Sequence, residues 1–250
     1  MSKYLIIGDA GHAEKVVGKE SPDKTLREWK FNHEVDIKIK KRCEDHKIDY
    51  YQTNPSPTGK DEIGLSKRAE LANTYWKNQG KPKSLFISYH ANAHLSYFTD
   101  VRGTETYMAS NASTNSKNAA KYINDEIYNT FKKFDSNAKN RGVKTSDFTV
   151  IYKSNMPAIL VEYGFYSNKE DLKILKNNVD DLVEATVRGI CKYFGIDYKE
   201  PDTSVNSSNT ETNISYRVVV GSFSNRNNAD AQVERLKKDG YDAFIEVQKK

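Results

Sequence analysis

Residues 84–92 read Ser-Leu-Phe-Ile-Ser-Tyr-His-Ala-Asn, a short apolar run that leads into a histidine. An apolar run of this length predicts a buried strand over 84–88 that ends at Tyr89 and His90. Similar runs at Tyr4–Ile7 and Ala158–Val161 predict two further buried strands. Buried strands that alternate with helices indicate an α/β fold.

The segments around these strands carry helical patterns. Apolar residues recur every fourth position from Phe31 to Cys43, which predicts a helix from about Glu28 into residues 44–47. Comparable patterns predict helices over 65–76, 123–134 and 172–194, the last ending at Gly195, and short apolar runs predict strands at 50–52 and 150–151. We therefore expect an α/β fold with a mostly parallel, twisted sheet flanked by helices.

The composition changes after residue 196. Residues 197–213 are rich in Ser, Thr and Asn, which is typical of a flexible linker. Order is predicted to resume with a strand at 216–220, a helix through Ala229, Val233 and Leu236, and a strand at 244–247. The expected organisation is thus a domain over 1–196, a linker over 197–213, and a small α+β unit over 214–250 that cannot bury a core alone.

The overall charge excludes some classes of protein. The formal net charge is +5, and both signs are spread along the 250 residues. A nucleic-acid-binding surface needs a concentrated basic stripe, so we expect no nucleic-acid partner. No apolar run is long enough to span a bilayer. The two cysteines, Cys43 and Cys191, fall on apolar helical stripes and are predicted to be buried free thiols.

Four side chains that can carry chemistry lie near predicted strand ends or a helix start. His12 follows the first strand in a glycine-flanked turn, Glu28 opens the first helix, and His90 ends the strand at 84–88. The carboxyl ends of parallel strands share one edge, so these three can meet there as zinc ligands. Glu162 follows the strand at 158–161 and is placed to take a proton from an attacking water. Glu34, further along the first helix, is a competing ligand.

Each of these residues has an ordinary structural explanation when it is taken alone. A loop histidine such as His12 is more often a surface side chain, and His90 is more often a hydrogen-bonded core residue. Glu28 suits the start of any helix, and Glu162 suits a buried ion pair. The prediction therefore depends on all four occurring together.

The order and local sequences of these segments resemble those of the zinc N-acetylmuramoyl-L-alanine amidases of the third amidase family. The resemblance spans residues 1 to about 195 and rests on Gly11–His12, the Glu28-x-x-x-Asn32 helix start, Ser88–Asn92 and Glu162–Asn168. Arg68 and residues 103–107 also match. Two positions depart from the family pattern: Ala10 stands where proline is usual, and Ala13 where a second glycine is common.

The resemblance implies a zinc-dependent peptidoglycan hydrolase. Its zinc ligands would be His12, Glu28 and His90, and its catalytic carboxylate would be Glu162. The spacing to Asn32 favours Glu28 over Glu34. The bond implied is the amide between N-acetylmuramic acid and L-alanine. Two alternatives stay open at this point: a zinc peptidase that cuts the stem peptide, and a non-catalytic protein that binds the cell wall.

The tail also resembles a known module. Residues 216–224, Tyr-Arg-Val-Val-Val-Gly-Ser-Phe-Ser, with Asn228–Ala229 and residues 236–240, are similar to the first half of a SPOR domain. That resemblance implies binding to glycan strands. Because a complete module has a second strand–helix–strand unit, we expect either that the natural protein continues or that the tail pairs with another copy. The oligomeric state stays open.

The N-terminus predicts where the protein is made. Met1–Ser2–Lys3 leads directly into an apolar stretch that is too short for a signal-peptide core. We expect synthesis in the cytoplasm without a cleaved leader, and action on the wall after release. A phage endolysin released through holin pores and an autolysin freed when a sporulating mother cell lyses both fit this expectation.

Overall fold

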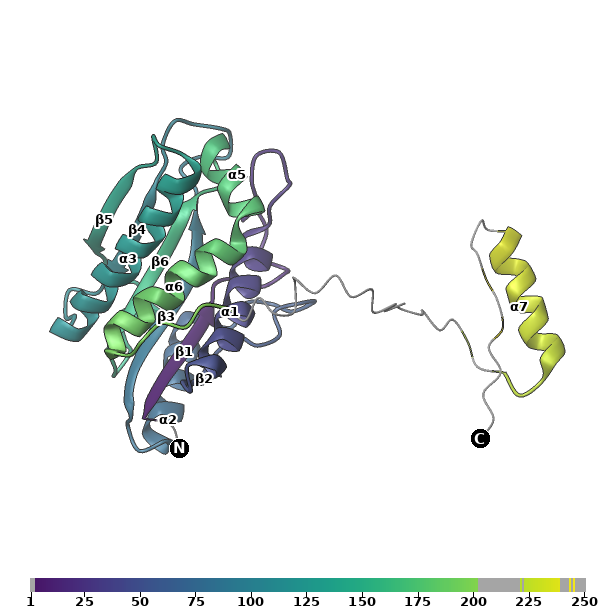
Figure 1. The fold of residues 1–250 in the computed structure, drawn as a ribbon, viewed down its shortest axis with the longest axis horizontal. Helices are drawn as coiled ribbons and strands as arrows, with labels where there is room; N and C mark the ends of the chain where they lie inside the picture. The colour runs from purple at the N-terminus through teal and green to yellow at the C-terminus, as the bar shows by residue number, and fades with distance from the viewer. Residues whose placement is uncertain (1–2, 202–220, 222, 239–242, 244, 246–250) are drawn as a thin grey trace. The chain divides into compact units, whose positions relative to one another are not determined.

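The computed structural model describes residues 3–201, 221, 223–238, 243 and 245 (Figure 1). The chain divides into two compact units, Met1–Pro201 and Asp202–Lys250. Unit 1 contains the sheet and all four candidate site residues. Within the described residues, no helix is both long and apolar enough to cross a membrane.

A six-stranded sheet in the order β2-β1-β3-β6-β4-β5 forms the centre of unit 1. β1, β2, β3 and β6 are parallel, β4 is antiparallel to β6, and β5 is parallel to β4. The carboxyl ends of β1, β3 and β6 therefore lie at the same edge as the amino ends of β4 and β5. The mostly parallel sheet confirms the predicted fold class. The strands are β1 Tyr4–Ala10, β2 Asp49–Gln52, β3 Lys83–Asn92, β4 Thr104–Met108, β5 Asn140–Thr145 and β6 Ala158–Phe165.

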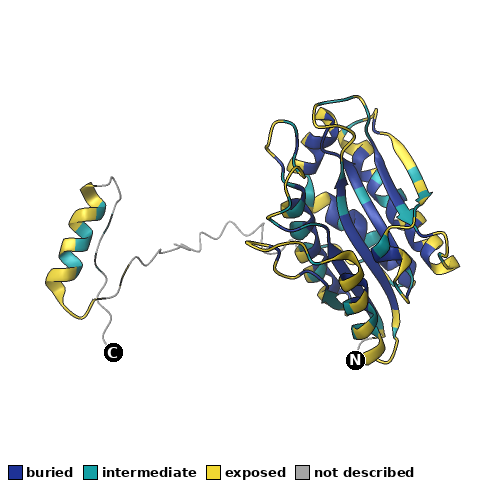
Figure 2. Ribbon diagram, turned by 180° about the vertical axis from the view of Figure 1, so that it is seen from behind, coloured by how far each residue is buried: buried dark blue, intermediate teal, exposed yellow. Residues whose placement is uncertain are grey.

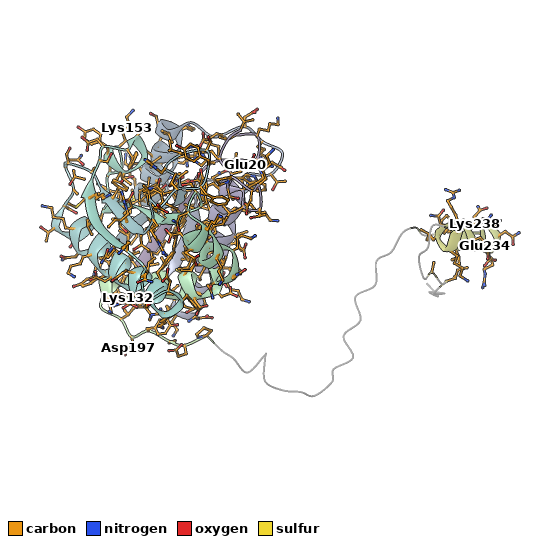
Figure 3. All side chains as sticks on the ribbon, turned by 90° about the horizontal axis from the view of Figure 1, so that it is seen from above. Glu20, Lys132, Lys153, Asp197, Glu234 and Lys238 are labelled. Atoms are coloured by element: carbon orange, nitrogen blue, oxygen red, sulfur yellow. The ribbon has the colours of Figure 1, made fainter. Side chains whose placement is uncertain are left out.

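Helices cover both faces of the sheet. One face packs against α1 (Glu28–Asp45), α3 (Thr114–Phe134), α5 (Lys169–Asn177) and α6 (Val179–Phe194), and the other against α2 (Leu65–Asn78) and α4 (Thr149–Tyr152). Figure 3 shows Lys132 of α3 and Lys153, which follows α4, on opposite sides of the sheet. The central strands are almost wholly buried (Figure 2), as their continuous apolar runs predict.

Two predictions of secondary structure were wrong. Val150 and Ile151 lie in the helix α4, where both side chains are buried against the sheet, and do not form a strand. The single helix predicted over 172–194 is two helices, α5 and α6, separated at Asn178. The predicted end at Gly195 is confirmed, since this residue has a left-handed conformation with φ 69°.

Two strands, β4 and β5, were not predicted because their sequences are polar. β4 buries Thr104, Glu105 and Thr106, whereas β5 is an edge strand whose residues are mostly exposed. Neither strand carries an apolar run, so the criterion that found β1, β3 and β6 does not detect them.

The predicted helix in the tail is confirmed as α7, Arg226–Lys238. The two tail strands predicted at 216–220 and 244–247 fall largely outside the described residues. In unit 1, Cys43 and Cys191 are buried free thiols, as predicted.

Candidate metal centre

Three of the four predicted site residues come together at the carboxyl edge of the sheet. His12 follows β1, Glu28 is the first residue of α1, and His90 lies near the end of β3. Each offers one ligand atom, and these atoms all lie within 4.8 Å of one another. Among the described residues this is the group of His, Cys, Asp and Glu side chains that could hold a metal ion.

The spacing and the burial of this group suit a small cation. His12 Nε2 lies 3.5 Å from Glu28 Oε2, and His90 Nδ1 lies 2.9 Å from Glu28 Oε1. In a tetrahedral site with bonds of about 2.1 Å, ligand atoms are about 3.4 Å apart. The Glu28 side chain is only 4% exposed, while the two histidines are 14% and 15% exposed and leave the group open on one side.

The turn before His12 is shaped by the second histidine. A Cβ atom on Gly11 would lie 2.2 Å from the His90 ring, so only glycine fits there. His12 itself has a positive φ of 64°, an uncommon conformation for a residue with a side chain. Its ring meets the His90 ring edge to face, with centroids 5.2 Å apart. The local backbone is therefore adapted to place the two imidazoles side by side.

The Glu28-x-x-x-Asn32 pattern has a structural explanation. Residues four apart lie on the same face of a helix, and Asn32 is fully buried beneath Glu28. The Asn32 amide donates to the Gly11 carbonyl at 3.0 Å and lies 3.5 Å from Glu28 Oε1. Asn32 thus ties the His12 turn to the start of α1. Glu34, the competing ligand, instead pairs with Lys38 at 2.8 Å and is not a member of the group.

The His12 nitrogen that faces away from Glu28 contacts a series of ionic groups that the sequence did not predict. His12 Nδ1 lies 3.1 Å from Glu62 Oε1. Glu62 also contacts Arg68, which is almost completely buried and binds the Asp9 carboxylate through one nitrogen at 3.0 and 3.2 Å. A carboxylate on one ring nitrogen fixes a histidine so that its other nitrogen faces a metal. The only sign of this network in the sequence was that Arg68 matches the pattern of the amidase family.

Glu162, the fourth predicted residue, lies within β6 rather than just after it. It is opposite His90 in the neighbouring strand β3. Its Oε2 atom is buried and has no hydrogen-bond partner among the described residues. Burial, together with the charges of Glu28 and Glu105, raises the pKa of the Glu162 carboxyl well above its usual value.

Glu28 shows the opposite shift. Burial opposes its ionisation, but the hydrogen bond from His90 and the charges of His90 and His12 outweigh burial, so the pKa of Glu28 lies below its usual value. The edge of the sheet therefore holds one carboxyl, Glu28, whose ionised form is favoured. The other, Glu162, resists ionisation in the metal-free protein.

Comparison with known proteins identifies two families along the chain. The family model described as N-acetylmuramoyl-L-alanine amidase matches residues 6–192, and the SPOR domain model matches residues 199–250. The second match begins inside the stretch expected to be a linker. The endolysin of Bacillus phage SPP1 is 28% identical over 203 residues, which cover 80% of this chain and 69% of the endolysin.

Two further similarities come from bacteria. The sporulation-specific N-acetylmuramoyl-L-alanine amidase of Bacillus subtilis (strain 168) is 25% identical over 190 residues, 76% of this chain and 65% of that protein. The crystal structure of N-acetylmuramoyl-L-alanine amidase from Clostridium difficile 630 superimposes with a TM-score of 0.66 at 28% identity, covering 78% of this chain and 98% of the other. The chain therefore belongs to the N-acetylmuramoyl-L-alanine amidase family and is an amidase that hydrolyses peptidoglycan.

Proposed function

We propose that the chain binds one zinc ion through His12, Glu28 and His90 and that Glu162 is its catalytic carboxylate. The observation that carries this proposal is the unpartnered Oε2 atom of Glu162, one strand away from three potential ligands. A buried carboxyl oxygen without a hydrogen-bond donor costs stability, and such groups concentrate at functional sites. Two imidazoles and one carboxylate, open on one side, fit the ligand set of catalytic zinc.

The chemistry is divided between the metal and the protein. When bound, zinc supplies Lewis acidity, which polarises a carbonyl group and makes a nearby water more acidic. Glu162 accepts a proton from the water as its oxygen attacks the carbonyl carbon. As the carbon–nitrogen bond breaks, Glu162 delivers that proton to the departing nitrogen. To accept this proton Glu162 must be ionised, and the positive charge of a bound zinc ion would favour that form over the protonated form that burial and the neighbouring carboxylates favour in the metal-free protein.

The bond in this proposal joins the lactyl group of N-acetylmuramic acid to L-alanine. The test is mass spectrometry of the soluble products released from purified peptidoglycan. Wild type, Glu162→Gln and wild type with a chelator are compared. Free stem peptides that begin at L-alanine are expected from wild type alone, while Glu162→Gln still binds zinc at one ion per chain.

Other products would contradict parts of the proposal. Shortened peptides that remain attached to muramic acid would identify a peptidase and refute the bond. Undiminished hydrolysis by Glu162→Gln would refute the role of Glu162. Full activity after removal of all bound metal would refute the role of zinc.

We also propose that the tail binds glycan strands and holds the catalytic unit near its substrate, which raises the effective substrate concentration. The match of residues 199–250 to the SPOR domain supports this. Such a tail suits an enzyme that reaches the wall on lysis of the cell that made it, as an endolysin or a mother-cell autolysin would. Sedimentation with purified cell walls tests the tail: a chain ending at Pro201 should bind more weakly than the full chain, and equal binding would refute the proposal.

A further inference from the structure

Glu162 has a second acidic neighbour on the side away from the metal ligands. In the sheet it lies opposite His90 on β3 and opposite Glu105 on β4. Side chains of residues directly opposite each other project from the same face of a sheet. His90, Glu162 and Glu105 therefore form a row across three strands, and the row reaches β5, where Gly142 lies opposite Glu105.

Glu105 is buried, and both of its carboxylate oxygens are hydrogen-bonded. Oε1 accepts from Asn92 Nδ2 at 2.7 Å and from the Tyr107 hydroxyl at 2.8 Å. Oε2 accepts from Arg141 Nε and Lys144 Nζ, both at 2.5 Å. Burial opposes ionisation, but Lys144 and Arg141 outweigh it, so the pKa of Glu105 lies below its usual value. An ionised Glu105 thus anchors two cations beside the catalytic row.

The sheet is distorted where Arg141 enters it. Thr104 lies opposite Asn140, but the next residue, Glu105, lies opposite Gly142, so Arg141 is the extra residue of a β-bulge. Gly142 has a positive φ of 75°, a backbone conformation that favours glycine. Space is not the reason for glycine here, because no atom lies within 4 Å of the position that a Cβ atom would take. Bulges next to active sites re-aim side chains, and this one directs the Arg141 side chain to Glu105.

The cluster of Glu105, Arg141 and Lys144 carries more positive than negative charge. One carboxylate faces two cations, and the side chains of Arg141 and Lys144 are 33% and 34% exposed. The remaining donors of both cations are therefore accessible to a ligand. We propose that Arg141 and Lys144 form a subsite for a carboxylate on the peptide part of the substrate. This inference rests on the proposed function, because it places the scissile bond at Glu162.

The distances suit a residue close to the cleaved bond. Glu162 and Glu105 lie on neighbouring strands about 4.8 Å apart, and the Arg141 and Lys144 nitrogens lie 2.5 Å from the Glu105 carboxylate, so the two cations lie roughly 7 Å from the Glu162 position. An extended peptide advances about 3.4 Å per residue, so the cations lie level with the second or third residue beyond the bond. In stem peptides the second residue, D-glutamate, is linked through its side chain and has a free α-carboxylate unless it is amidated. A diaminopimelate at the third position offers another.

The experiment uses the full chain loaded with zinc and synthetic N-acetylmuramoyl peptides in matched pairs. One pair has, at the second position, either D-glutamate linked through its side chain or the α-amide of that residue, D-isoglutamine, with lysine at the third position. The other pair has free or amidated diaminopimelate at the third position, with isoglutamine at the second. The pair that shows a preference identifies the carboxylate bound. A charge-assisted contact is expected to favour the free carboxylate by about tenfold or more in kcat/KM.

The double variant R141Q/K144Q tests the residues. The ratio of kcat/KM between the acid and the amide substrate is expected to fall towards one, mainly through KM. The chain offers a matched control at Glu126, which accepts from Arg188 at 2.8 Å and from Lys192 at 2.6 Å where α3 meets α6. Because this contact lies between two helices away from the catalytic row, R188Q/K192Q should keep the wild-type ratio.

The outcomes separate the two proposals. Hydrolysis of both members of each pair without preference, or an unchanged preference in R141Q/K144Q, would overturn the subsite while leaving the proposed function intact. An equal loss on acid and amide substrates in R141Q/K144Q would assign the two cations a structural role and also overturn it. Failure of the wild type to release any peptide that begins at L-alanine would overturn the proposed function and the subsite with it.

Discussion

The two sides of the site treat a buried carboxyl group in opposite ways. On the side of β1, β3 and α1, the Glu28 carboxylate lies 2.9 Å from His90 Nδ1 and 3.5 Å from His12 Nε2. The pKa of Glu28 is lowered. On the side of β6, the Oε2 atom of Glu162 has no partner among the described residues, and its pKa is raised. The comparison teaches that the neighbouring charges, rather than burial alone, decide whether the pKa of a carboxyl at this edge is lowered or raised.

The largest effect should follow from replacement of Glu162, the proposed catalytic carboxylate. Glu162→Gln keeps the shape of the side chain but cannot transfer the proton, so kcat should fall by about 10²–10⁴-fold. Zinc content, measured by elemental analysis, should stay at the wild-type level. Loss of zinc together with activity would show that Glu162 belongs to the metal-binding side and would break the comparison.

Glu28→Gln should fail in the other way. Without this proposed anionic ligand, zinc affinity measured by competition with a chromophoric chelator should fall by at least about 100-fold, which is more than the loss expected from changes outside the ligand set. Glu34→Gln is the matched control, since Glu34 lies on the same helix and forms an ion pair with Lys38. Equal loss in both variants would point to a general effect of charge on α1.

In the zinc-free protein the two carboxyls should have opposite effects on stability. The folded-state pKa of Glu162 is raised, so its contribution is complete below the unfolded pKa of about 4.3 and is lost as pH rises through the folded value. Glu162→Gln should therefore raise the free energy of unfolding at pH 8 by about 1–3 kcal/mol, with a smaller gain at pH 5.

The Glu28 pKa is lowered, so its contribution is present above the unfolded pKa and is lost as pH falls through the folded value. Glu28→Gln should lower the free energy of unfolding at pH 8. Urea unfolding with chelator present measures both variants at the two pH values. Shifts of the same sign would contradict the contrast between the two groups.

The smallest effect is expected from the residue behind His12. Glu62→Gln keeps a hydrogen-bond acceptor near His12 Nδ1 but removes the charge, so zinc affinity should fall by about tenfold. Glu62→Ala should cost more, because the ring then loses its orienting contact. Lys67 and Glu70 form an exposed pair nearby in sequence, so Glu70→Gln serves as a control that should leave zinc affinity unchanged. No change in Glu62→Ala would show that the turn alone orients His12.

The sequence predicted the parts of the fold that follow a simple pattern. β1, β3 and β6 are buried apolar runs, and α1 and α7 carry the expected apolar spacing. β4 and β5 were missed because they bury or expose polar residues. α4 was mistaken for a strand because two buried apolar residues fit either structure.

The chain order of motifs by itself determined the family, the fold class and the three residues that meet as a possible metal group. This was possible because parallel strands bring their carboxyl ends to one edge wherever those ends lie in the sequence. Only the tertiary structure decided what surrounds each charge. Glu62 reaches His12 from an irregular loop, and Glu105 meets Glu162 across an antiparallel pair that no local pattern encodes. Charges act over distances in space, so their pKa values and partners follow from the folded arrangement and not from spacing along the chain.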